Sequence, residues 1–343
     1  ADLRERQRER LQQRLPPLLF ALVEWLPGDR IIFERHTDYF KPGLPYLDRV
    51  ELHLNVPEEA RVLRWENGEA EYVDYFDGVQ AGELPRIQND PELAPLVRMT
   101  PSTIFDFFQI ASNVEPFTDV RVRQAIAMAL DKQALAESTG IGASMPMDDI
   151  YTDLLPMYDP DFVSNYQYDP AAARQLLVEA GFADGIKGVD MYVDFHPYQG
   201  AIVQADLAKI GIEVNLLDGE PALYQDRIMS GEIPLVFTGF GTLIRDGSSF
   251  ASWVLGCVGD APPARALYCN DETQQLLGQA NLLPLGDPQR NEIFQRIQEI
   301  VVNEAVYFIP VYRRNVLGLG QNYVKDERYS TGLPELESAY LEQ

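Results

Sequence analysis

Histidine and cysteine, two residue types that often bind metals or carry out catalysis, are sparse in this sequence. It contains only three histidines, His36, His53 and His196, and they lie far apart along the chain. No HExxH or paired Cys-x-x-Cys pattern is present, so neither a structural nor a catalytic zinc site is expected. The chain also lacks a GxSxG elbow and a glycine-rich phosphate loop with its lysine. These absences predict a protein that is not an enzyme and that uses no cofactor.

Carboxylates are abundant, and three of them, Asp148, Asp149 and Asp153, gather in one segment. Such a group could transfer protons in acid–base chemistry or hold calcium. Its spacing lacks the alternation and the closing glutamate of a calcium-binding loop. We therefore interpret the segment as a solvated acidic loop, with proton transfer and calcium binding as the alternatives.

The only two cysteines, Cys257 and Cys269, flank a loop that contains Gly259, Pro262 and Pro263. These residues favour turns that can bring the two sulfurs together, so we predict a disulfide. Such bonds persist in oxidising compartments. Two buried thiols are the alternative, whereas a metal site is poorly supported because no histidine lies nearby.

The net charge disfavours two classes of partner. The 343 residues include 53 acidic and 28 basic side chains, which gives a formal net charge of -25. Phosphates are neutralised by clustered Lys and Arg, so no nucleic-acid partner is expected, and anionic membrane surfaces are disfavoured for the same reason. We interpret the charge as a solvated acidic coat. A preference for cationic ligands or a salty habitat is the alternative.

No stretch of the sequence is expected to span a membrane. The longest apolar run, residues 15–26, is interrupted by Pro16, Pro17 and Glu24 and is too short to cross a bilayer as a helix. Residues 1–14 are highly charged and do not resemble the apolar core of a secretory signal. If the protein is exported, we expect its signal to have been removed or to lie outside this sequence.

Local patterns in the first half predict strands, turns and one long helix. Pro27 and Gly28 predict a hairpin between the first two strands, and Thr118 is the candidate cap of a helix that extends to near Gly140. An irregular stretch is expected at residues 140–167. The expected strands lie at 18–25, 30–35, 50–55, 72–76 and 104–110, with a helix at 57–67.

The second half predicts alternating helices and strands, which is typical of an α/β sheet with covered faces. A glycine follows each of the first three helices, as left-handed helix ends require. The expected helices lie at 170–180, 201–210, 221–229, 271–283 and 287–303. The expected strands lie at 189–195, 212–217, 233–238, 306–311 and 315–319.

A series of sequence blocks occurs in an order that is typical of one protein family. The most distinctive block, PFTDVRVRQAIAMALDK, begins at Pro116. The others are LVEWLPGDR from Leu22, FERHTDYF from Phe33, PYLDRV from Pro45, NGEAE from Asn67, YDPAAARQLLVEAGF from Tyr168, QADLAKIGIEV from Gln204 and IPVY from Ile309. Through this series, residues 22–312 resemble the peptide and nickel family, family 5, of extracellular solute-binding proteins of ABC importers, which includes dipeptide- and oligopeptide-binding proteins.

The resemblance implies an α/β fold of the periplasmic-binding-protein type II kind, a two-lobed clamshell that closes by hinge motion. Family members carry a further segment before the region of Leu22, so we expect the N-terminal part of the fold to be truncated. On this pattern residues 1–20 form a charged N-terminal segment, 21–110 part of the first lobe, 111–300 a second α/β lobe, and 301–343 a return to the first lobe.

The function implied by the resemblance is capture of a small solute, peptide-like or other, between the two lobes. The implied partner is an ABC permease in the membrane, and the implied location is periplasmic or extracellular, with surface anchoring as a variant. A second hypothesis is an accessory or structural subunit of a larger extracytoplasmic or membrane-associated assembly that no longer binds ligand. A hydrolase of unknown specificity is the third.

The resemblance also implies where a ligand is contacted. Peptide-binding members carry a tryptophan followed three residues later by an aspartate that pairs with the peptide ammonium, and here Phe240 and Leu243 stand at these positions. Phe240 can still stack on a ligand, but leucine cannot neutralise a cation. We predict Phe240, Arg245 and Asp246 as ligand-binding residues, with Trp253 as core or as part of the binding wall.

Overall fold

The computed structural model separates the chain into two compact units. It describes residues 18–73, 83–139, 144–194, 197–242, 246–255, 270–326, 328–330 and 333–342. Unit 1 consists of residues 1–98 and 317–343, and unit 2 consists of residues 99–316. The assignment of two lobes to the ranges expected from the sequence stays a prediction.

Unit 1 begins with an antiparallel sheet in the order β1-β2-β3. These strands are β1 (Phe20–Leu26), β2 (Arg30–Arg35) and β3 (Arg49–His53). Gly28 has a φ of 83°, which glycine adopts at little cost, and the Asp29 N–H donates to the Leu26 carbonyl at 3.0 Å. The hairpin predicted at Pro27 and Gly28 is therefore confirmed.

A small apolar core in unit 1 surrounds Trp65, which is fully buried on α2 (Glu58–Glu66). It packs with Val62, Val73, Ile87 and Leu319, so the last part of the chain closes a core built from the first part. The other elements that end or lie in this unit are β4 (Tyr72–Val73), α3 (Leu84–Asn89), η1 (Ala94–Leu96), β10 (Phe308–Gly320), β11 (Val324–Lys325), β12 (Arg328–Ser330), β13 (Leu333–Glu335) and β14 (Tyr340–Leu341).

Unit 2 is built on a mixed sheet in which β10, β5, β9, β7 and β8 are successive neighbours and β6 pairs with β10. Its further strands are β5 (Val97–Ile110), β6 (Ser144–Pro146), β7 (Ile186–Val193), β8 (Ile212–Leu217) and β9 (Leu235–Gly241). Strand β7 is parallel to β8 and β9, whereas β5 is antiparallel to β9. The predicted alternation of helices and strands thus gives parallel β-α-β connections.

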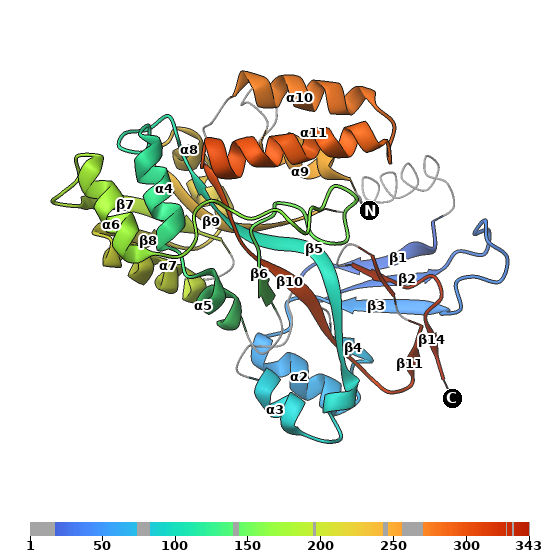
Figure 1. Ribbon diagram of the computed structural model, residues 1–343. Coiled ribbons are helices and arrows are strands. Elements are labelled where there is room, and N and C mark those ends of the chain that lie inside the picture. The colour runs from blue at the N-terminus through green and yellow to red at the C-terminus, as the bar shows by residue number, and fades with distance from the viewer. Residues whose placement is uncertain are drawn as a thin grey trace. The chain divides into compact units, whose positions relative to one another are not determined.

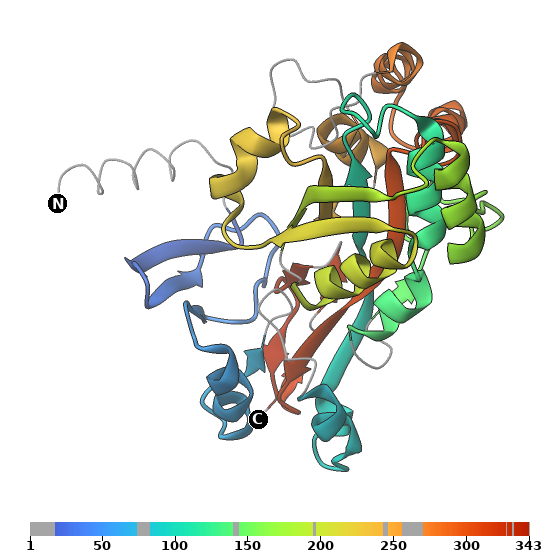
Figure 2. The ribbon, with the colours of Figure 1, turned by 90° about the vertical axis from the view of Figure 1, so that its left-hand side faces the viewer.

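Helices cover both faces of this sheet (Figure 1). One layer, with α4 and α6 side by side (Figure 2), packs on Phe108 and Ile110, and the other packs on Phe105 and Phe107. The part of β5 at residues 102–110 is therefore buried on both faces, as its largely apolar run requires. None of the described helices combines the length and apolar character that crossing a bilayer demands. The first layer holds α4 (Val120–Ala129), α5 (Lys132–Glu137), α6 (Pro170–Glu179) and α7 (Pro197–Lys209), and the second α9 (Gly247–Val254), α10 (Asp271–Leu282) and α11 (Pro288–Gln298).

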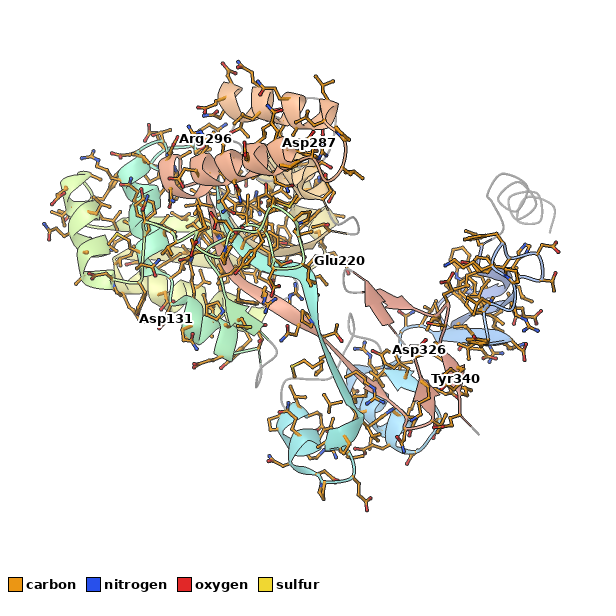
Figure 3. The ribbon with its side chains drawn as sticks, turned by 45° about the vertical axis from the view of Figure 1, so that its right-hand side comes forward. Asp131, Glu220, Asp287, Arg296, Asp326 and Tyr340 are labelled. Atoms are coloured by element: carbon orange, nitrogen blue, oxygen red, sulfur yellow. The ribbon has the colours of Figure 1, made fainter. Side chains whose placement is uncertain are left out.

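Aspartate side chains fix the starts of the first helices of unit 2. Asp119 caps α4, at the position after the predicted cap Thr118. Leu130 is extended, with a ψ of 118°, and Asp131 then accepts from the Ala134 N–H at 2.9 Å to begin α5 (Figure 3). The single long helix predicted from Thr118 is therefore wrong, because the Asp131 carboxylate supplies a new first turn with its acceptor.

Two further predictions differ from the structure, and one helix has no counterpart among the expected elements. The two strands expected at 306–311 and 315–319 are one strand, β10, whose Tyr312 and Arg314 pair with β6 and so remain in the sheet. The helix expected at 287–303 divides into α11 and a π-helix, η2 (Glu299–Glu304). Helix α9 is not predicted by the sequence. Helix α8 (Pro221–Met229) lies at its predicted bounds.

Candidate functional site

The carboxyl ends of parallel strands β7, β8 and β9 meet at one edge of the sheet in unit 2. Ligands of open α/β sheets bind beyond this edge. Asp194 directly follows β7, and Gly239 near the end of β9 lies opposite Asp106 of the antiparallel strand β5. This edge is therefore the candidate site. Residues 195–196 and 243–245, which continue from these strands, lie outside the described residues.

An ion pair with a fully buried carboxylate joins β5 to β10 at this edge. Nε of Arg314 lies 2.6 Å from Oδ2 of Asp106, and Nη2 donates to Oδ1 at 3.1 Å. The Asp106 side chain has an exposed fraction of 0%, whereas the Arg314 side chain retains 21%. The two contacts fix the plane of a guanidinium whose side chain still reaches solvent.

Burial raises the pKa of Asp106 to about 6, because desolvation disfavours its charged form. Arg314 opposes this effect by Coulomb attraction and hydrogen bonding, and repulsion from Asp194 adds to it. The Asp106 carboxylate is therefore charged at neutral pH and takes up a proton under mildly acidic conditions.

Gly239 leaves the space that the Arg314 guanidinium occupies. A Cβ atom at position 239 would overlap Nη2 of Arg314 and would lie 2.8 Å from Oδ1 of Asp106. Any larger residue at this position would displace the ion pair.

A second buried carboxylate, Asp194, connects the ends of β7 and β9. Its exposed fraction is 2%. Thr238 Oγ1 donates to Asp194 Oδ2 at 3.0 Å, and the Tyr192 hydroxyl lies 3.3 Å from Oδ1 and 2.9 Å from the carbonyl oxygen of Gly219. Asp194 therefore holds together the strand ends that form the edge.

The structure places the predicted ligand-binding residues in different settings. Phe240 is half-buried at the end of β9, and its ring meets that of Phe250 edge-on at 5.6 Å. Arg245 lies outside the described residues, as does the side chain of Trp253 on α9. The ligand contacts predicted for these residues stay predictions.

Asp246 is buried and engaged by protein groups. Its carboxylate accepts from Nε and Nη2 of Arg290 at 2.9 and 2.7 Å, and from the Ser248 N–H at 2.9 Å, which caps α9. Burial acts to raise the pKa of Asp246, but these hydrogen bonds outweigh it and leave the pKa below its ordinary value. A ligand contact through Asp246 also stays a prediction, and the carboxylate has a structural role in addition.

The prediction of a solvated acidic loop is wrong for Asp149, which is buried, and for Asp148, which is half-buried, whereas Asp153 is exposed. Asp149 is 4% exposed and accepts from the backbone N–H groups of Tyr151 and Asp159 at 2.5 and 3.0 Å. Asp148 pairs with Lys132 at 2.5 Å, and Asp153 pairs with Arg313. Backbone donors thus hold the Asp149 carboxylate in the interior, and Lys132 holds that of Asp148, whereas the Asp153 side chain keeps an exposed fraction of 45% beside Arg313. In the described part of the chain no three His, Cys, Asp or Glu side chains are grouped to hold a metal.

Asp106, Asp194, Gly239 and Arg314 are not singled out by the sequence patterns. The sequence does contain one signal for the ion pair. Asp106 lies inside the apolar strand expected at residues 104–110, and a buried carboxylate requires a partner. That partner is 208 positions away, so no local window contains it.

The predicted disulfide falls on Cys257 and Cys269, which both lie outside the described residues. We expect the denatured protein to carry no iodoacetamide-reactive thiol before reduction and to gain two labels after it, as mass spectrometry would show. Closing a loop of this length would stabilise the fold by about 3 kcal/mol. Labelling of both cysteines without reductant would refute the bond.

The fold is that of the periplasmic binding proteins. The DppA protein of Helicobacter pylori, solved with the peptide STSA, matches 100% of this chain and 68% of its own length, with a TM-score of 0.80 and 21% identity. The NikA protein of Brucella suis, solved with Fe(III)-EDTA, matches 94% of this chain and 68% of its own, with a TM-score of 0.80 and 20% identity. The predicted fold class is confirmed.

The family is shown by the match of residues 19–262 to the middle region of the bacterial extracellular solute-binding proteins, family 5, and the chain belongs to this family. Heme-binding protein A of Haemophilus influenzae is 29% identical over 302 residues, 85% of this chain and 53% of that protein. Di/tripeptide-binding protein 1 of Pseudomonas aeruginosa is 26% identical over 320 residues, 91% of this chain and 58% of that protein. The chain therefore spans little more than half the length of these relatives.

Proposed function

We propose that this chain acts as a substrate-binding component of an ABC importer and captures a small solute at the sheet edge of unit 2 without transforming it. The Asp106–Arg314 pair at this edge carries the proposal. Burying a carboxylate costs of order several kcal/mol, and well-packed apolar side chains would serve stability as well or better. An ion pair fixed at the edge where open α/β sheets bind ligands is better explained by recognition of a solute.

The names of the relatives point to more than one kind of solute. They state heme for one protein and di- and tripeptides for another. We propose a peptide-like or other small solute for this chain. The half-buried ring of Phe240 supports stacking against it, and Arg245, Asp246 and Trp253 are its further proposed contacts.

A function of this kind requires a permease and a location outside the cytoplasm, so we propose both. The membership in an extracellular solute-binding family supports them. The permease receives the solute, and the binding protein remains in the periplasm or at the cell surface.

Thermal unfolding and titration calorimetry with dipeptides, tripeptides, glutathione and hemin test this function. A solute at 100 times its Kd stabilises the folded chain by about 2.7 kcal/mol, so the Tm rises with solute concentration. Mass spectrometry of the recovered solute should find it unchanged. No stabilisation by any solute, together with co-purification in a large assembly, would favour the accessory-subunit hypothesis, and turnover would end the binding proposal.

A further inference from the structure

Arg314 is held in place through both its backbone and its side chain. Ser102 Oγ donates to the carbonyl oxygen of Arg314 at 2.7 Å, and Arg314 pairs with Ser144 of the neighbouring strand β6. Asp106 holds two nitrogens of the guanidinium. Because the side chain is already ordered, a ligand that binds it pays little further rotamer entropy.

A comparison with Arg290 indicates that stability alone does not account for Arg314. Arg290 and its partner Asp246 are both almost fully buried, at 5% and 4%, and Arg290 also donates to the Leu283 carbonyl at 3.2 Å. That pair ties α9 to α10 and α11. Arg314 instead keeps 21% of its side chain exposed at the edge where parallel strands end, with the buried carboxylate of Asp106 on one side of it.

We propose that Arg314 binds a carboxylate, or another planar anionic group, of the solute, and that Asp106 is a positioning residue that orients the guanidinium. This role rests on the proposed function and adds the chemical class of the ligand group. A guanidinium matches a carboxylate through two parallel N–H···O bonds. Asp106 neutralises the charge of Arg314, so the preference for a planar anionic group comes from the fixed, directed N–H groups of the guanidinium and not from a net positive charge at this edge.

The test compares acids with their neutral counterparts: peptides and their C-terminal amides, glutathione and its diethyl ester, hemin and its dimethyl ester. We expect the wild-type chain to bind one acid at least about tenfold more tightly than its neutral form in titration calorimetry. Arg314→Met should weaken binding of that acid by about 10- to 150-fold, as for loss of a charge-assisted hydrogen bond, and should leave binding of the neutral form unchanged. Arg314→Lys should recover only part of the affinity, because lysine has the charge without the planar fork.

Arg313→Met is the matched control, because Arg313 is the adjacent residue of β10 and pairs with Asp153 instead. This variant should retain the preference for the acid. If Arg314→Met unfolds because Asp106 loses its partner, the double variant Asp106→Asn with Arg314→Gln removes both charges and provides the same readout.

The outcomes separate the two proposals. A wild-type chain that binds no member of the panel overturns the proposed function and the role of Arg314 with it. A wild-type chain that binds acid and neutral form equally, or that keeps its acid preference after the loss of Arg314, overturns the role of Arg314 alone.

Discussion

Replacement of Arg290 by methionine should lower the unfolding free energy by about 3–5 kcal/mol, the usual cost of removing one member of a buried ion pair. Asp246 would then keep a charge at 4% exposure without its bidentate partner. The change would also remove hydrogen bonds from Arg290 to the carbonyls of Ala280 and Leu283. Urea unfolding followed by circular dichroism measures the loss.

Arg296→Met on the same helix is the matched control (Figure 3). Arg296 is 40% exposed and pairs with Glu272 and Glu304, and exposed pairs of this kind contribute about 0–1 kcal/mol. The double variant Asp246→Asn with Arg290→Met should lose less stability than Arg290→Met alone, because no unpaired charge remains buried. Equal losses for the two single arginine variants would contradict the structural role of the Asp246–Arg290 pair.

Stability should fall as the pH rises from about 4 to about 7, with Asp149 as the main cause. Burial raises the pKa of Asp149 to about 7, although hydrogen bonds from Asp159, Tyr151 and Gln298 favour the charged form. An aspartate of the unfolded chain loses its proton near pH 4, so in this interval the folded chain holds a proton that the unfolded chain has released. Ionisation of Asp149 then costs the folded state up to about 4 kcal/mol.

Asp149→Asn isolates this contribution. Asp106, with a pKa of about 6, acts in the same direction but only up to that pH. From about pH 6 to about pH 7.5 the wild-type chain should therefore continue to lose stability, and the variant should not. Urea unfolding at closely spaced pH values measures both profiles. A wild-type profile that is flat or rises in this window would show that Asp149 ionises without penalty.

Local signals predict much of the secondary structure. The alternation at 212–217 and the proline-started, glycine-ended segment at 221–229 predict β8 and α8 at the bounds that the structure has. These elements are predictable because the turn, cap and periodicity that define them lie within a few residues. The boundary near Asp131 is missed because a helical apolar pattern continues across it, while one side chain restarts the helix.

The charged groups at the candidate site depend on the tertiary structure. Asp106 meets Arg314 from 208 positions away, and Asp246 meets Arg290 from 44. The strength of such a pair depends on separation and burial, and both are set by strand order, register and helix packing. The sequence by itself determined most of the elements, the alternation that makes an α/β sheet, and the ordered blocks of the family. Only the packing of those elements decided which carboxylates are buried and which arginine is held at the edge of the candidate site, because charges distant along the chain interact through space.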